Sequence, residues 1–168
     1  IYLAQIEQRD VSPGDRDAAE IVEIVAPLRT QKRRQGIGLT AAERKAVELR
    51  AMELAASYLK SLGYQYKDTS SKESYDFLAD KHGHTLKIEV KGTTSDICDS
   101  IMMTKNEVEL HRREKGFTGL IIVSGIKLSK SDKEITARNG SIEALLQWDI
   151  DKWSSSPIAY QISRSGDK

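Results

Sequence analysis

Apolar and polar positions alternate with a helical period between Thr40 and Gly63. At 100° per residue, one face carries the apolar side chains Val47, Ala51, Met52, Leu54, Ala55, Tyr58, Leu59 and Leu62. Thr40 with Glu43 forms a capping-box pattern at the start of this predicted helix, and Gly63 supplies its end. Glu48 falls on the apolar face, where a carboxylate needs a partner or access to water.

Strand-length segments follow this helix at residues 64–68, 75–80 and 85–92. The second and third flank a short polar turn around Gly83, which predicts a β-hairpin. Residues 100–103 predict a further short strand. Residues 117–128 form a continuous apolar run, which is typical of a central strand covered on both faces.

A second helix is predicted from Thr104, whose capping-box partner is Glu107, to Gly116. Beyond Leu128 the pattern is weaker. We interpret residues 129–140 as a loop or peripheral hairpin, residues 141–153 as helix or strand, and residues 157–163 as a closing strand. The order helix, three strands, helix, strand predicts an α/β fold with a mixed central β-sheet flanked by helices.

The first part of the chain predicts a separate helix and a linker. Ser12 suits the N-cap, Pro13 the first helical position and Pro27 the end of this helix. The basic stretch that follows is expected to be a linker, and a solvated connection is its simplest explanation. Its basic residues are also candidates for phosphate contact, namely Lys32, Arg33 and Arg34. We therefore assign residues 1–39 to helix and linker, and residues 40–168 to the main domain.

Composition narrows the classes of function. The chain has 168 residues, enough for one domain with a sizeable core, and no apolar run long enough to cross a bilayer. A net charge of +1 neither demands nor excludes nucleic acid, so DNA contact requires local basic clusters. Cys98 is the single cysteine, as expected for a reducing, cytoplasmic protein. The start lacks Met and a signal-peptide pattern, which indicates a piece of a longer protein with further domains.

Charged side chains in the predicted hairpin point to chemistry. In a strand, successive side chains face opposite ways, so Ile88 and Val90 are expected on one face and Glu89 and Lys91 on the other. Asp76 begins the first hairpin strand and is expected to lie beside Glu89. The three charges would then converge at one edge of the sheet. Exposed cross-strand charge pairs are the alternative explanation.

Two carboxylates set close together repel unless a cation lies between them, and a few hard oxygen ligands suit Mg²⁺. Bound Mg²⁺ would acidify a water and offset charge on a leaving oxygen, as phosphodiester hydrolysis requires. Lys91 would stabilise the negative charge of the transition state, and Glu48 would add a ligand or orient a water. This hypothesis requires all four side chains to meet in one pocket.

Glu48, Asp76, Glu89 and Lys91 together resemble the active-site signature of the PD-(D/E)XK nuclease superfamily. More narrowly, the chain resembles the family named after the C-terminal domain of the plant protein NO VEIN. That resemblance covers roughly residues 41–126 and is carried by "VELRAMELA", "YDF", "IEVKGT", "MTKNEVELH" and "LIIVSGI". Members occur as modules of large bacterial and archaeal proteins, some linked to restriction of modified DNA.

The resemblance implies an α/β/α core and a Mg²⁺-dependent DNA endonuclease domain within a larger restriction or defence protein. It implies Asp76 and Glu89 as metal ligands, the Val90 carbonyl as a further one, Lys91 as the catalytic lysine and Glu48 as the helix acid. Double-strand cleavage would need two active sites, which a homodimer would provide. Relatives of the fold also include modules that only bind or scaffold, so a silent module that binds DNA or a partner domain is the alternative.

Other polar residues are weaker candidates. Thr104, Asn106 and Glu107 match the family pattern, but the capping box already accounts for Thr104 and Glu107. Arg112 and Arg113 near a helix end are candidates for phosphate contact, although such charge runs are usually solvated.

Asp149 and Asp151 would form a metal pair without a third ligand, and His82 and His84 are expected to face solvent in a turn. A reader of modified bases would need an aromatic pocket for a flipped base. Aromatic residues make up 6% of the chain and its two tryptophans come late, which does not favour a reader.

Overall fold

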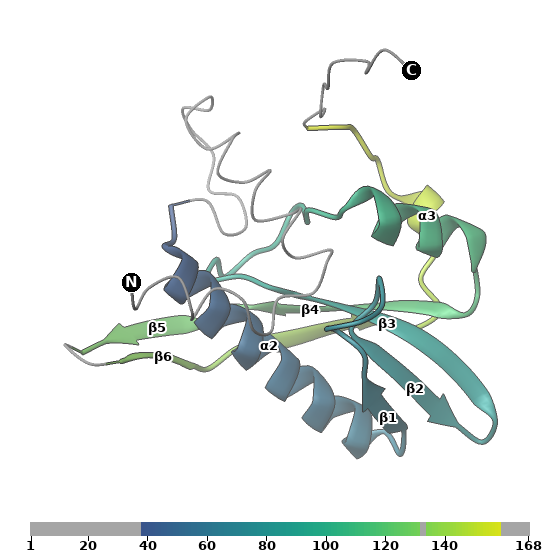
Figure 1. Ribbon diagram of the computed structural model, residues 1–168, viewed down its shortest axis with the longest axis horizontal. Helices are drawn as coiled ribbons and strands as arrows, with labels where there is room; N and C mark the ends of the chain where they lie inside the picture. The colour runs from purple at the N-terminus through teal and green to yellow at the C-terminus, as the bar shows by residue number, and fades with distance from the viewer. Residues whose placement is uncertain (1–37, 132–133, 159–168) are drawn as a thin grey trace, which may run out of the picture.

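The computed structural model describes residues 38–131 and 134–158, which are organised around one five-stranded sheet (Figure 1). Its strands, in spatial order, are β1 (Gln65–Asp68), β2 (Phe77–Lys81), β3 (His84–Gly92), β4 (Thr118–Ser124) and β7 (Ser141–Leu145). β3 and β4 are parallel and the other neighbours are antiparallel. The predicted α/β fold with a mixed sheet is therefore confirmed.

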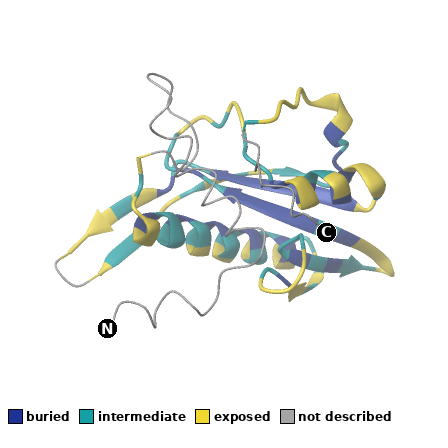
Figure 2. Ribbon diagram, turned by 45° about the horizontal axis from the view of Figure 1, so that its top comes forward, coloured by how far each residue is buried: buried dark blue, intermediate teal, exposed yellow. Residues whose placement is uncertain are grey.

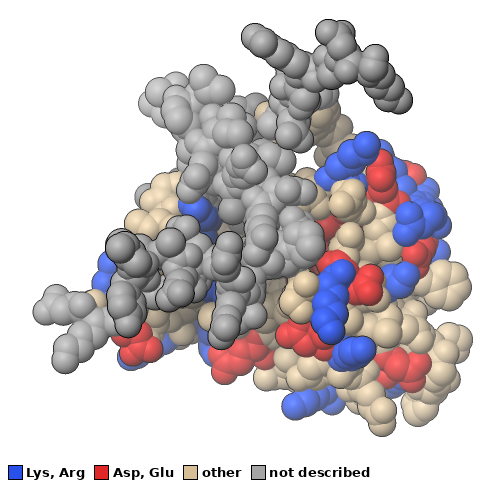
Figure 3. Space-filling view, in the orientation of Figure 1, with Lys and Arg blue, Asp and Glu red and all other residues tan. Residues whose placement is uncertain are grey.

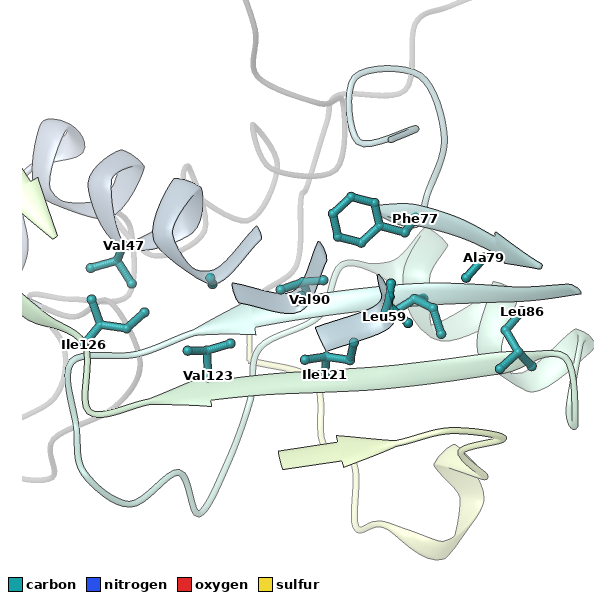
Figure 4. Close-up of a cluster of buried hydrophobic side chains, with 12 residues drawn as sticks. Val47, Leu59, Phe77, Ala79, Leu86, Val90, Ile121, Val123 and Ile126 are labelled. Atoms are coloured by element: carbon teal, nitrogen blue, oxygen red, sulfur yellow. The ribbon is translucent and has the colours of Figure 1, made fainter. Parts of the chain in front are cut away.

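Helix α2 (Ala41–Ser61) covers one face of the sheet. The predicted capping box is present, because Thr40 Oγ1 accepts from the Glu43 amide and Glu43 Oε2 accepts from the Thr40 amide. The helix contributes Val47, Ala51, Ala55 and Leu59 to a buried apolar cluster completed by side chains of β2, β3 and β4 (Figure 4). Ile88 and Val90 of β3 belong to this cluster, so the α2 face is the apolar face of that strand.

The hairpin between β2 and β3 fixes the relative position of the candidate acids. His82 and Gly83 form its two-residue turn with φ values of 55° and 81°, the left-handed pair that a tight hairpin of type I′ requires. The resulting register pairs Phe77 with Ile88. Asp76 immediately precedes β2, and its amide donates to the Ile88 carbonyl at 2.9 Å.

The second face of the sheet is covered by α3 (Lys105–Arg113) and by the segment around η2 (Ile150–Lys152) (Figure 2). α3 joins the parallel strands β3 and β4, as a crossover connection of this length must. A second buried cluster lies on this face and consists of Leu120, Ile122, Trp148 and Ile150. The predicted capping box of Thr104 and Glu107 is present at the start of α3.

Several expected boundaries differ from those observed. Residues 100–103 form no strand, because Ile101 and Met103 pack on the second cluster as an extended loop without a neighbouring strand. The apolar run 117–128 is interrupted at Gly125, whose φ of 71° turns the chain away from the sheet. α3 ends at Arg113 and not at Gly116.

The structure decides some of the alternatives predicted for the segments beyond Leu128. The stretch after Leu128 is a peripheral hairpin of β5 (Lys127–Lys130) and β6 (Ile135–Arg138), one of the two predicted forms. Residues 141–153 form strand β7, then η2. Residues 157 and 158 are not in a strand, and the rest of the expected closing strand lies outside the described residues. The expected helix from Ser12 to Pro27 and the basic linker residues Lys32, Arg33 and Arg34 also lie outside them.

Candidate active site

The face of β3 opposite α2 carries the candidate chemistry. Since Ile88 and Val90 point into the α2 cluster, Glu89 and Lys91 point toward α3. Phe77 also belongs to the α2 cluster, so Asp76 beside it turns to the same side as Glu89. β3 is the central strand of the sheet, which places these charges in the interior of the fold and not at a sheet edge as expected.

Lys91 lies between two carboxylates. Its Nζ is 2.5 Å from Glu89 Oε1 and 3.2 Å from Glu107 Oε2. The side chain of Lys91 is 10% exposed and those of Glu89 and Glu107 are each 5% exposed. We call Asp76, Glu89, Lys91 and Glu107 the acid–lysine cluster, because Asp76 acts electrostatically on both Glu89 and Lys91.

Burial and charge set the protonation of this cluster. Burial raises the pKa of Glu89 well above its usual value; the Lys91 ammonium opposes this rise, and the negative charges of Asp76 and Glu107 add to it. Burial alone would lower the pKa of Lys91, but Glu89, Glu107 and Asp76 together raise that pKa above its usual value. Lys91 therefore stays a cation among acids that repel one another.

Asp76 is fixed by the backbone of β3. Its Oδ2 accepts a hydrogen bond of 2.7 Å from the Val90 amide, while its own amide donates to Ile88. The carboxylate thus takes the place of a backbone acceptor where β2 has not yet begun. This arrangement holds the Asp76 side chain next to the main chain of Val90, the residue whose carbonyl was predicted as a further ligand.

The helix that carries Glu48 lies on the other side of the sheet. Its helix α2 packs on the face formed by Ile88 and Val90, whereas Glu89 and Lys91 point to the α3 face. The Glu48 carboxylate is 37% exposed and accepts from Lys45 Nζ at 2.9 Å. The structure therefore brings together Asp76, Glu89 and Lys91. The meeting of all four side chains in one pocket, which the hypothesis requires, stays a prediction for Glu48.

Sequence reasoning missed the contact between Glu107 and Lys91. Glu107 Oε2 accepts from the Thr104 amide at 2.8 Å and from Lys91, so one carboxylate caps α3 and also holds the lysine. In the sequence, the capping box by itself accounts for Glu107, so no contact with Lys91 is predicted. The spacing of Glu107 and His111 could have indicated this contact. The two residues are four positions apart, so they share one face of the helix, the face that packs on β3.

That histidine, His111, is fully buried and was not predicted. Its two ring nitrogens find no hydrogen-bond partner among the described residues. The imidazole meets the Trp148 ring edge-to-face with centroids 5.0 Å apart. Burial lowers the pKa of His111 to about 4, although the nearby Glu107 opposes this shift. His111 is therefore a neutral core residue that connects α3 to Trp148.

The candidate phosphate contacts are distributed differently. Thr104 is buried as the N-cap, and Asn106 is exposed on the first turn of α3. Arg112 donates to Asp151 Oδ1 at 3.2 Å and to Ser155 Oγ at 3.1 Å, and Arg113 contacts Glu114. On the described surface visible in Figure 3, basic and acidic side chains are interleaved. Arg112 and Arg113 thus belong to a mixed-charge surface.

The two other motifs weighed from the sequence have structural explanations. His82 and His84 are exposed at the hairpin turn, as expected. Asp149 is the N-cap of η2, so the two Asp do not share a strand face. Both Asp149 and Asp151 form ion pairs with Lys115.

The acid–lysine cluster suits only one kind of Mg²⁺ site. Among residues 38–131 and 134–158, no three His, Cys, Asp or Glu side chains form a group that could hold a metal ion. Mg²⁺ commonly binds through one or two carboxylates, with waters and substrate phosphates completing its shell. The mutual repulsion of Asp76 and Glu89 and the adjacent Val90 main chain fit that mode, in which a substrate supplies the missing oxygens.

Comparison with known proteins gives one match. Residues 47–136 match the model of the family described as Protein NO VEIN, C-terminal. No curated protein and no solved structure matches the chain. Among the described helices, none combines the length and the apolar composition of a membrane span.

Proposed function

Because the chain belongs to the family described as Protein NO VEIN, C-terminal, we propose that it is a Mg²⁺-dependent DNA endonuclease domain of the PD-(D/E)XK type. The observation that carries this proposal is the position of Lys91, which lies between Glu89 and Glu107 with Asp76 beside them. A buried cation surrounded by acids is expected where a phosphate and a metal ion must be bound together.

The proposed ion would be held by Asp76, Glu89 and the Val90 carbonyl. When bound, Mg²⁺ supplies charge that acidifies a water and stabilises the leaving oxygen. The protein's own contribution is to fix these oxygens in advance. The bond from the Val90 amide to Asp76 Oδ2 and the contact of Lys91 with Glu89 Oε1 prevent the two carboxylates from turning away from each other.

Lys91 would stabilise the charge that develops on the scissile phosphate. An ammonium has three N–H donors, and Glu89 and Glu107 take up two of them, which leaves one for a phosphate oxygen. Because the site is buried, this contact is stronger than it would be in water. Glu107 is a positioning residue in this scheme, since it orients Lys91 without reaching the substrate.

The test is nicking of supercoiled plasmid by the full chain in the presence of Mg²⁺. We expect Lys91→Ala and Asp76→Asn to reduce the rate by about 100-fold or more, as for loss of a charged group that stabilises a transition state. Glu107→Gln keeps the capping box but removes the charge beside Lys91, so kcat should fall about tenfold or more while KM changes little.

The fold offers a matched control. Glu43 is the capping-box acid of α2 and holds Lys130 at 2.6 Å, as Glu107 holds Lys91, but it lies on the other face of the sheet. Glu43→Gln and Lys130→Ala should therefore leave nicking unchanged. Equal nicking by the wild-type protein and Lys91→Ala, both folded by circular dichroism, would remove Lys91 from the mechanism.

A second candidate function is a catalytically silent module that binds DNA or a partner domain. Two observations favour it: the described residues contain no three-ligand metal group, and Lys91 is engaged by two acids. This alternative predicts no Mg²⁺ binding and unchanged biological activity for Asp76→Asn. Isothermal titration with Mg²⁺ separates the two proposals.

The setting of the domain is also a proposal. The family is named for a C-terminal region, which supports a domain that works beside others in a larger restriction or defence protein. Cutting both strands of DNA would require two copies of the site, and a homodimer would provide them. Light scattering with and without a short DNA duplex would test this dimer.

A further inference from the structure

A pocket of about 210 Å³ lies on the α3 face of the sheet. It is bounded by residues before and within α3, such as Met103 and Val108, and by residues from Trp148 to Ser156. Pockets for drug-sized ligands measure about 300–1,000 Å³. This pocket is smaller, and it suits one flat ring system better than an extended ligand.

Two aromatic rings form part of the pocket wall. Trp148 and Trp153 both line it, and their rings meet edge-to-face with centroids 5.5 Å apart. Trp148 is 5% exposed and is held on another side by His111, so its position is fixed by packing. Trp153 is 36% exposed. A buried ring and a partly exposed ring in one pocket wall offer apolar surface to a planar ligand.

Polar groups in the wall can recognise the edge of such a ligand. The hydroxyl-bearing residues Ser100, Ser154 and Ser156 also line the pocket. Aromatic faces combined with a few donors and acceptors are what an unstacked nucleobase requires.

The pocket lies near the acid–lysine cluster on the same face of the sheet. The Trp148 amide donates to the Thr118 carbonyl of β4, and Thr118 is paired with Lys87 of β3, two residues before Glu89. Trp148 is thus about two strand spacings from β3, on the order of 10 Å. That distance corresponds to about three nucleotide steps along a strand.

We propose that the pocket lined by Trp148 and Trp153 receives one unstacked nucleobase of the DNA strand whose backbone lies at the acid–lysine cluster. The choice of a nucleobase rests on the proposed function, because a DNA substrate brings bases within reach of the pocket. Binding there would select DNA that is single-stranded, distorted or easily unpaired, since extracting a base from such DNA costs least.

The experiment uses the intrinsic tryptophan fluorescence of the full chain. The chain has two tryptophans and both line the pocket, so quenching reports on this site. The chain is titrated in the presence of Ca²⁺, which binds oxygen ligands in place of Mg²⁺, with a single-stranded oligonucleotide and with an abasic oligomer of equal length and charge. We expect saturable quenching by the base-containing oligonucleotide and weak or no quenching by the abasic one.

Variants assign the binding to the pocket. Trp153→Ala should weaken binding of a labelled oligonucleotide about tenfold, the order expected for one lost stacking contact, and Trp153→Phe should restore most of it. Phe117→Ala is the matched control, because Phe117 is an exposed aromatic residue outside the pocket. It should leave the affinity unchanged.

The outcomes separate this inference from the proposed function. Equal affinity for both oligomers, or no quenching by either, overturns the base pocket even if plasmid is nicked. Base-dependent quenching that Trp153→Ala weakens supports the pocket even if no nicking occurs, in which case the endonuclease proposal fails alone. Lys91→Ala should retain the quenching, because Lys91 does not line the pocket.

Discussion

His111 is a titratable side chain held inside the protein in its neutral form. It is fully buried, and its two ring nitrogens have no partner among the described residues. Burial lowers its pKa from 6.5 to about 4, so protonation is unfavourable in the folded protein and ordinary in the unfolded chain. Its neutral state therefore couples folding to pH.

This coupling has a definite sign. The unfolded chain takes up a proton at His111 below about pH 6.5 and the folded protein only below about pH 4, so stability falls as the pH falls through this window. His111→Leu should remove this component, which amounts to at most roughly 3 kcal/mol. Urea denaturation of both proteins between pH 8 and about pH 4 measures it. Identical pH slopes for the two would contradict the depressed pKa.

The residues of the site differ in how well the sequence alone predicts their positions. Glu89 and Lys91 alternate with apolar neighbours, and that local period was enough to place them on one face. The position of Asp76 beside Glu89 was predicted from the length of the hairpin. The contact of Glu107 with Lys91 depends on where α3 docks, which no local pattern contains. The helical period predicted that Glu48 faces a core. It could not predict which side of the sheet that core lies on.

At the scale of elements, Gly92 explains how closely α2 approaches the end of β3. A Cβ at this position would lie 2.9 Å from the Ala51 Cβ, 3.1 Å from Val47 Cγ1 and 3.2 Å from the Val47 carbonyl oxygen. The absence of a side chain lets the helix lie directly on the strand, one residue after Lys91. The position of α2 over this end of β3 therefore depends on a glycine.

Gly92→Ala should push α2 away from β3 and destabilise the fold by about 1–3 kcal/mol, the usual cost of overpacking. Gly116→Ala is a suitable comparison. Gly116 has a φ of +82° and nothing within 4 Å of its Cβ position, so only backbone strain of about 1–2 kcal/mol is expected there. Urea midpoints at one pH measure both. A loss below about 1 kcal/mol for Gly92→Ala would show that α2 yields freely.

The elements that were predicted well are those with local signals. Each capping box, like the two-residue turn, is formed by residues only a few positions apart, so its cause lies in the local sequence. The strand expected at residues 100–103 and the interrupted run at Gly125 depend on which neighbours are available in the fold. Strand β7 was ambiguous for the same reason, because it is defined by pairing with β4.

At the scale of the whole molecule, the family match is shorter than the structural unit. The match ends at residue 136, before β7 and before Trp148 and Ile150 of the second buried cluster. β4 is buried on both faces, and β7 covers its outer edge by antiparallel pairing. Segments outside the match are therefore needed to complete the sheet and the pocket wall.

A chain ended after Gly140 would retain every residue of the match but lose β7, so β4 would become an apolar edge strand and Leu120 and Ile122 would lose Trp148 as a neighbour. We expect this chain to aggregate or to unfold without cooperativity, whereas a chain ended after Ile158 should unfold cooperatively. Thermal unfolding by circular dichroism, with light scattering for aggregation, compares the two. Cooperative unfolding of the shorter chain at the same temperature would mean that the matched region folds alone, and that β7 and Trp148 are additions to a core that does not need them.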